Sequence, residues 1–340
     1  MRIHLKPLSK QVIVITGASS GIGLTTAEMA ARAGARVILS SRNEADLLDA
    51  VVRIRDKGGN AFHIVADVAD PGAVDSIAAL AIEQFGGIDT WVNNAGVGMY
   101  GKLTETPLAD KRRLFDVDFW GVVHGCRTAV RHMRGGGALI NVGSVASDRA
   151  APLLGIYSAA KHAVKGYTDA LRMELDHDQI PISVSLVKPA SINTPFIQHA
   201  RSHMDSEPEF IPPVYPPEEV ARAILECAVR PTRDVLVGGA AKFLSGAGRM
   251  APGAMDAYME ATAFTQQKRG QPNDHMDALD APQRDGQRRG PTARYTLKRS
   301  AYTRMSMSRA GRALPYVAAA VAAGLMFRLR DSQADAGSSA

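Results

Sequence analysis

The sequence has few cysteines and no long apolar segment near its N-terminus. Only two of its 340 residues are cysteine, Cys126 and Cys227, and neither lies near a second cysteine or a histidine cluster. This spacing excludes a disulfide scaffold and a structural zinc site, predicts no metal, and favours a reducing compartment. The apolar run at residues 12–15 is too short for the core of a signal peptide. We therefore expect a cytoplasmic protein whose chain begins almost directly with its first strand.

Positive charge is concentrated toward the C-terminus. Residues 268–312 contain eleven Lys or Arg and four Asp, and this segment accounts for the net charge of +6. No motif of basic residues with interleaved aromatics accompanies the charge, so no nucleic-acid partner is predicted.

An uncharged, alanine-rich run of fifteen residues spans positions 313–327. As a helix it would be about 22 Å long, which is short of the ~30 Å hydrocarbon core of a bilayer. We favour a short apolar helix that docks on a core or a dimer partner. Peripheral attachment to a membrane is the alternative, and residues 328–340 are expected to form a disordered tail.

Short apolar runs alternate with amphipathic helical patterns up to about residue 240, which is typical of an α/β fold with a doubly wound sheet. Strands are predicted at residues 12–15, 36–39, 61–65, 90–92, 138–142, 183–187 and 234–237. Helices are predicted at residues 23–33, 45–57, 71–85 and 108–133. We expect a Rossmann-type sheet of about seven parallel strands in a single domain over residues 1–250. A basic, helical or flexible extension is expected over 251–312, with a helix at 256–265 and a mobile linker at 271–290.

A glycine-rich turn, with Gly17, Gly21 and Gly23, follows the first predicted strand and opens the first predicted helix. Glycines in this context allow a tight turn and a close approach of the backbone to a pyrophosphate. The helix N-terminus adds oriented N–H groups and partial positive charge. A plain strand–turn–helix without a ligand is the alternative interpretation.

Three side chains farther along the chain could act on one substrate atom. Tyr157 and Lys161 are four residues apart and fall on one helix face, and Ser144 could reach the same place from a neighbouring strand end. A Tyr–Lys pair alone is more often a half-exposed helix face. With the TGxxxGxG turn and the serine spacing, however, the chain resembles the short-chain dehydrogenases/reductases over about residues 8–245.

The resemblance implies a role for each of these residues. Tyr157 is the proton donor, Lys161 lowers the pKa of that tyrosine and holds the nicotinamide ribose, and Ser144 donates to the substrate oxygen. Asp118 stands where the family has an asparagine that holds a water of the proton relay. We expect the relay to survive with a raised pKa of Tyr157 and a more alkaline pH optimum.

The resemblance also implies a nicotinamide cofactor. Its predicted contacts are Gly17, Ser19, Ser20, Gly21, Ile22, Gly23, Ser41, Arg42, Asp67, Val68, Asn94, Ala95, Gly96, Tyr157, Lys161, Pro189, Ile192 and Thr194. Ser41 occupies the position where NAD-preferring members have an aspartate, and the guanidinium of Arg42 matches a phosphate. We therefore expect NADP(H), with NAD(H) as the alternative if Arg42 is only a solvated loop residue.

These expectations predict an oxidoreductase that transfers a hydride between NADP(H) and a carbonyl or secondary alcohol. Residues 196–215 fall where the family has a mobile lid, and their apolar side chains favour a bulky or apolar carbonyl compound. The resemblance implies a homo-oligomer. One alternative is a catalytically weak NADP(H)-binding regulator or scaffold with the same fold. Another is an enzyme whose role is set by membrane placement and lipid-derived carbonyls.

Overall fold

The computed structural model describes residues 3–273, 276–292 and 294–308. The chain divides into two compact units, residues 1–300 and 301–340. The described part of the second unit contains helix α11 (Ala301–Met307), and every other element below belongs to the first unit. The apolar run at 313–327 and the tail at 328–340 lie outside the described residues.

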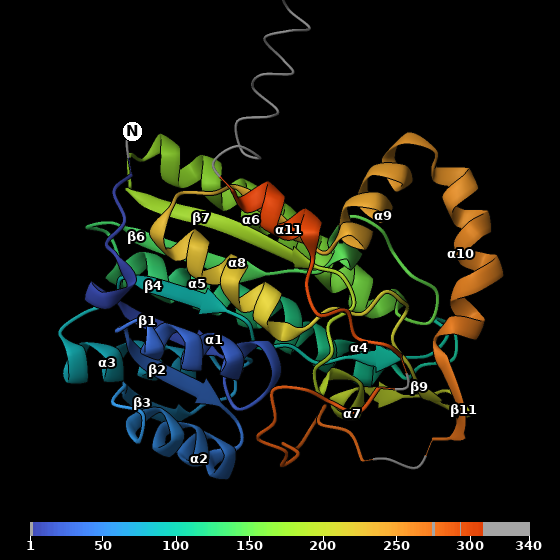
Figure 1. Cartoon of the computed structure of the whole chain (residues 1–340), viewed down its shortest axis with the longest axis horizontal. Coiled ribbons are helices and arrows are strands. Elements are labelled where there is room, and N and C mark those ends of the chain that lie inside the picture. The colour runs from blue at the N-terminus through green and yellow to red at the C-terminus, as the bar shows by residue number, and fades with distance from the viewer. Residues whose placement is uncertain (1–2, 274–275, 293, 309–340) are drawn as a thin grey trace, which may run out of the picture. The chain divides into compact units, whose positions relative to one another are not determined.

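Seven parallel strands form the central sheet, in the order β10-β7-β6-β4-β1-β2-β3 (Figure 1). They are β1 (Val12–Thr16), β2 (Arg36–Ser41), β3 (Asn60–Val65), β4 (Thr90–Asn93), β6 (Gly137–Val142), β7 (Ile182–Pro189) and β10 (Asp234–Val237). All seven predicted strands are confirmed. Every residue of β1, β4, β6 and β7 is buried, as expected for parallel strands that helices cover on both faces.

Helices pack on both faces of the sheet (Figure 1). One face carries α1 (Gly21–Arg32), α2 (Glu44–Arg55) and α8 (Pro217–Val229), and the other carries α3 (Pro71–Phe85), α5 (Gly121–His132) and α6 (Gly155–His177). The helix predicted over 108–133 is divided into α4 (Leu108–Phe115), the π-helical turn η2 (Asp116–Trp120) and α5. A π-helical turn inside a helix is frequently found at a functional site.

The strand order reverses between β1 and β4, because β2 and β3 lie on one side of β1 while β4 and the later strands lie on the other. In such sheets ligands bind outside the carboxyl ends of the strands at this switch point. The topology therefore brings the turns after β1, β2, β3 and β4 to one edge.

The short helix η1 (Leu8–Lys10) precedes β1 at the amino ends of the strands. The other short elements follow strands or lie near their carboxyl ends (Figure 1). They are β5 (Met99–Tyr100), η3 (Val145–Ser147), α7 (Phe196–His199), β8 (Arg201–Ser202), β9 (Ser206–Pro208), α9 (Gly239–Met250), α10 (Pro252–Gln266) and β11 (Lys268–Pro272). The helix expected at 256–265 is present as α10, and β11 pairs with β9 in an antiparallel ribbon. No helix among the described residues is long and apolar enough to cross a membrane.

The segment expected to be a mobile linker, residues 271–290, instead makes specific contacts with the body. The Ala278 amide donates to the His199 carbonyl at 2.9 Å, and the Gly21 amide donates to the Gln287 carbonyl at 2.8 Å. The first compact unit comprises residues 1–300 and so includes this segment.

Gly125 of α5 lies so close to β4 that a side chain there has no room. A Cβ at this position would lie 1.9 Å from Oδ1 of Asn93, whose side chain bonds Trp91 and Asn141 in the core. We predict that Gly125→Ala lowers the free energy of unfolding by about 2 kcal/mol, measured by urea denaturation. Gly166→Ala is the control: this exposed position in α6 has no atom within 4 Å of its Cβ, and alanine should add roughly 0.5–1 kcal/mol. Equal unfolding free energies for the two variants would contradict the packing described.

Candidate active site

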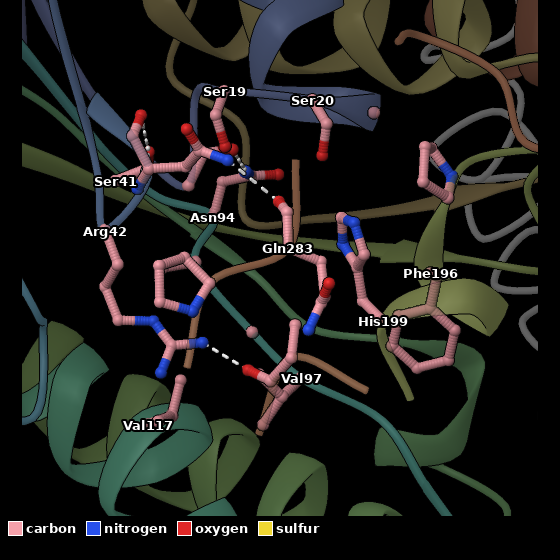
Figure 2. A pocket seen from close by; sticks show the side chains of 18 of the residues that line it. Ser19, Ser20, Ser41, Arg42, Asn94, Val97, Val117, Phe196, His199 and Gln283 are labelled. Carbon is pink, nitrogen blue, oxygen red and sulfur yellow. Dashed lines mark hydrogen bonds between the residues drawn. The ribbon is translucent and has the colours of Figure 1, made fainter. Parts of the chain in front are cut away.

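A cleft opens at the carboxyl ends of β1, β2, β3 and β4 (Figure 2). Thirteen of the predicted cofactor contacts line it: Gly17, Ser19, Ser20, Gly21, Ile22, Ser41, Arg42, Asp67, Val68, Asn94, Ala95, Gly96 and Thr194. The structure thus brings five separate segments of the sequence to a single elongated site.

The glycine turn after β1 touches the turn after β4. The backbone of Gly17 has φ +64°, and a Cβ there would lie 2.7 Å from Cα of Ala95. The Asn94 amide donates to the carbonyls of Thr16 and Gly17, both at 3.0 Å. Gly23 lies behind the turn, where a Cβ would meet the Gly17 carbonyl at 2.1 Å. Only glycine fits these two positions, and the N-terminus of α1 therefore faces the cleft directly.

The far end of the cleft carries charged groups from β2 and β3. Arg42 follows Ser41 there and donates to backbone carbonyls of residues 278–280. The Asp67 carboxylate accepts from the Ala69 amide at 3.0 Å and from Arg113. Burial disfavours the charged form of Asp67, but that amide and Arg113 outweigh it and lower the pKa of the carboxyl.

Ser144, Tyr157 and Lys161 line a second cavity. Ser144 precedes η3 and follows β6, and its Oγ accepts from the Ala146 amide at 3.1 Å. Tyr157 and Lys161 lie near the start of α6, with the lysine Nζ 5.5 Å from the centre of the tyrosine ring. Pro189, Ile192 and Thr194 line the same cavity, so the predicted loop after β7 reaches this site as well.

The two cavities adjoin each other. They share the lining residues Ile22, Asn94, Gly96, Thr194 and Phe196. The cavity that contains Tyr157 therefore begins beside the glycine turn.

Asp118 does not line either cavity, but it forms an ion pair with Lys161 on the side of the protein core. The π-helical turn η2 places its carboxylate in the core, 3.1 Å from Lys161 Nζ, and the other carboxylate oxygen accepts from the Val97 amide at 2.7 Å. Both charged side chains are almost completely buried. A buried charge of this kind requires a partner, so this ion pair fixes the lysine in place.

The three titratable groups influence one another. Burial raises the pKa of Tyr157; Lys161 and the Ser144 hydroxyl oppose the rise, and the negative charge of Asp118 adds to it. Burial disfavours the ammonium of Lys161, but Asp118 and Tyr157 outweigh it and raise the pKa of the lysine. Burial also raises the pKa of Asp118, against the effect of Lys161. The lysine therefore carries its charge beside Tyr157, while Asp118 offsets part of the effect of that charge on the phenol.

Several lining residues were not predicted from the sequence. Phe196 packs edge-on against Tyr157 with ring centres 5.4 Å apart; only its place at the start of the expected lid signalled it. His199 and Gln283 also line the cleft, as Figure 2 shows. Nothing in the polar composition around Gln283 indicated a place in a binding site.

The residues present fit a dinucleotide. The turn that faces the cleft excludes any side chain at Gly17, which leaves backbone N–H groups at a helix N-terminus for an anionic group. The adjoining cavity contains a half-buried tyrosine and a buried ammonium. Among the described residues no group of His, Cys, Asp or Glu is arranged to hold a metal ion.

Comparisons with known proteins agree with this geometry. The family model of short chain dehydrogenases matches residues 11–205. An uncharacterized oxidoreductase, YxnA, of Bacillus subtilis is 42% identical over 331 residues, which cover 96% of this chain and 91% of that protein. A putative oxidoreductase, SadH, of Mycobacterium tuberculosis is 32% identical and covers 68% of this chain and 87% of its own length.

Solved structures show the same fold. A short chain dehydrogenase/reductase from Burkholderia phymatum, in complex with NAD, is 26% identical with a TM-score of 0.64, covering 80% of this chain and 100% of that one. The chain belongs to the short-chain dehydrogenase/reductase family. It is an NAD(P)-dependent oxidoreductase.

The ion pair between Asp118 and Lys161 should affect the pH at which Tyr157 titrates. Because the carboxylate disfavours a second negative charge on Tyr157, Asp118→Asn should lower the pKa of the tyrosine and shift its ultraviolet pH titration to lower pH. Asp116→Asn removes an exposed carboxylate from the same turn and is the matched control. A Tyr157 titration that is identical in both variants would show that the Asp118 charge does not act on the phenol.

Proposed function

We propose that the protein interconverts a carbonyl compound and a secondary alcohol with NADP(H) as the preferred cofactor. The observation that carries this proposal is that the two cavities adjoin, because this places the glycine turn next to the cavity with Ser144, Tyr157 and Lys161. When bound, the nicotinamide supplies the hydride for reduction or accepts it for oxidation.

In the direction of reduction, the substrate carbonyl oxygen gains negative charge and needs a proton. The Tyr157 hydroxyl donates that proton, and Ser144 donates a hydrogen bond that holds the oxygen. The Lys161 ammonium stabilises the resulting tyrosinate. Asp118 is a positioning residue, because its buried carboxylate keeps the ammonium charged and directed at the site.

In the direction of oxidation, the same groups act in reverse. Tyrosinate accepts the alcohol proton, so oxidation requires Tyr157 to be deprotonated. Because burial and Asp118 raise the pKa of this tyrosine, oxidation should be favoured at alkaline pH. The alkaline optimum expected from the aspartate at position 118 thus remains part of the proposal.

The preference for NADP(H) rests on the end of β2. Ser41 has no carboxylate that would repel a ribose 2′-phosphate. Arg42 lies next to Ser41 on the wall of the cleft. A guanidinium pairs with phosphate through charge-assisted hydrogen bonds.

The substrate side of the second cavity favours an apolar compound. Its lining includes Leu154, Phe210, Ile211, Leu244 and Met259. These side chains come from α9, α10, the expected lid and the residue that precedes α6. We propose bulky, uncharged ketones, aldehydes or secondary alcohols as substrates.

Removal of the Tyr157 hydroxyl should eliminate proton transfer. With NADPH and a panel of apolar carbonyl compounds, we expect Tyr157→Phe to lower kcat by about 10²–10⁴-fold, measured by the loss of nicotinamide absorbance. Tyr167→Phe, which removes a hydroxyl from the same helix outside both cavities, should retain the wild-type rate. Equal rates for wild type and Tyr157→Phe would exclude this mechanism. Tight NADPH binding without turnover of any compound would favour a regulator or scaffold.

A further inference from the structure

Residues 277–287, which we call the strap, run along the cofactor cleft. Ala278, Pro282 and Gln283 are among the lining residues, and Figure 2 shows Gln283 among the side chains that line the cleft. These residues come from the segment that resembled a linker in sequence. The strap therefore belongs to the wall of the cleft.

Charged and polar bonds attach both ends of the strap to the body. Arg201 of β8 holds the Asp277 carboxylate with two hydrogen bonds, at 2.9 and 3.0 Å, and the Asp280 carboxylate at 2.8 Å. Farther along, the Asp285 amide donates to Asp46 at 3.0 Å. The strap is thus fixed over its length, and Arg201 is its main anchor outside the cleft.

Backbone carbonyls in the middle of the strap accept hydrogen bonds from Arg42. One terminal nitrogen of this guanidinium donates to the carbonyls of Leu279 and Asp280, at 3.0 and 3.2 Å, and the other donates to the carbonyl of Ala278. Both terminal nitrogens of Arg42 therefore have neutral oxygen partners in place of a phosphate.

A second group of the cleft is occupied in the same way. The Gly21 amide, the first of α1, donates to the Gln287 carbonyl at 2.8 Å. Strap carbonyls thus bond to Arg42 and to the Gly21 amide. Both of these groups would attract the phosphate groups of a dinucleotide.

We propose that the strap is a specificity-determining element of the cofactor site, whose carbonyls at residues 278–280 compete with a ribose 2′-phosphate for Arg42. This inference rests on the proposed binding of NADP(H). A phosphate is the stronger partner for a guanidinium, because its hydrogen bonds are charge-assisted. NADP(H) therefore displaces the three carbonyls, whereas NAD(H) leaves Arg42 on the strap.

As a consequence, the affinity for NADP(H) exceeds the affinity for NAD(H) by a smaller factor than Ser41 and Arg42 would give without the strap. Part of the free energy gained from the 2′-phosphate is offset by the bonds that Arg42 loses. Loosening the strap should remove this offset for the phosphorylated cofactor and leave the affinity for NAD(H) much less changed.

The first test is direct binding, with the full chain and no substrate. Dissociation constants for NADPH and NADH are measured by calorimetry for wild type, Arg201→Ala and Asp277→Ala, which release the same anchor from opposite sides. We expect each variant to raise the ratio of NADPH to NADH affinity by roughly tenfold. Arg131→Ala is the control and should leave the ratio unchanged. It removes an exposed arginine of α5 that pairs with Asp75 of α3.

Arg42 supplies the decisive background. In Arg42→Ala, the 2′-phosphate and the strap have no shared partner, so adding Arg201→Ala should no longer change the affinity ratio. A ratio that rises equally with and without Arg42 would overturn the competition, as would an unchanged ratio in both single strap variants.

Hydrogen exchange of the wild-type chain tests the proposal without any substitution. The amides of Ala278 and Leu279 are hydrogen bonded, so their exchange reports the state of the part of the strap that bonds Arg42. We expect NADPH to accelerate this exchange and NADH to leave it nearly unchanged. Slower exchange with both cofactors would show that the strap closes over the dinucleotide and would overturn the proposal. Failure of wild type and strap variants to bind either dinucleotide would instead overturn the proposed function.

Discussion

The site depends on the contact between two backbone turns at the carboxyl ends of β1 and β4. Gly17 approaches Ala95 so closely that a side chain at the glycine would overlap it, and Asn94 holds the turn through two carbonyls. This contact joins the two halves of the sheet where its strand order reverses. It keeps backbone N–H groups at the surface of the cleft, and it directs the cleft toward Tyr157.

The end of the site that contains Tyr157 depends on a buried charge. Lys161 can remain an ammonium in the protein interior because Asp118 lies 3.1 Å away on the π-helical turn η2. The carboxylate is itself bonded to the Val97 amide, next to the turn after β4. The glycine turn, the ion pair and the tyrosine are thus parts of one network, and the aspartate at position 118 determines how strongly the lysine acts on the phenol.

Much of this could be predicted from the sequence, for physical reasons. Every residue of β1, β4, β6 and β7 is buried, so their apolar runs are continuous and easily identified. Tyr157 and Lys161 are one helical turn apart, and the resemblance to the family implied their roles and that of Ser144. The division of residues 108–133 by a π-helical turn left no trace in the periodicity. The strap also left no trace in the sequence. Its contacts with Arg42 and Gly21 are made by its backbone carbonyls, which are present in every polypeptide. Its Asp, Arg and Gln side chains resemble those of a solvated linker.

The central claim is that the two adjoining cavities hold a nicotinamide dinucleotide from the end of β2, past the glycine turn, to Tyr157. A crystal structure of the full chain with NADP(H) tests it most directly. The account predicts the adenine ribose beside Ser41 and Arg42, the pyrophosphate at the N-terminus of α1, and the nicotinamide in the cavity with Tyr157 and Lys161. A nicotinamide outside that cavity, or a dinucleotide bound away from the glycine turn, would contradict it.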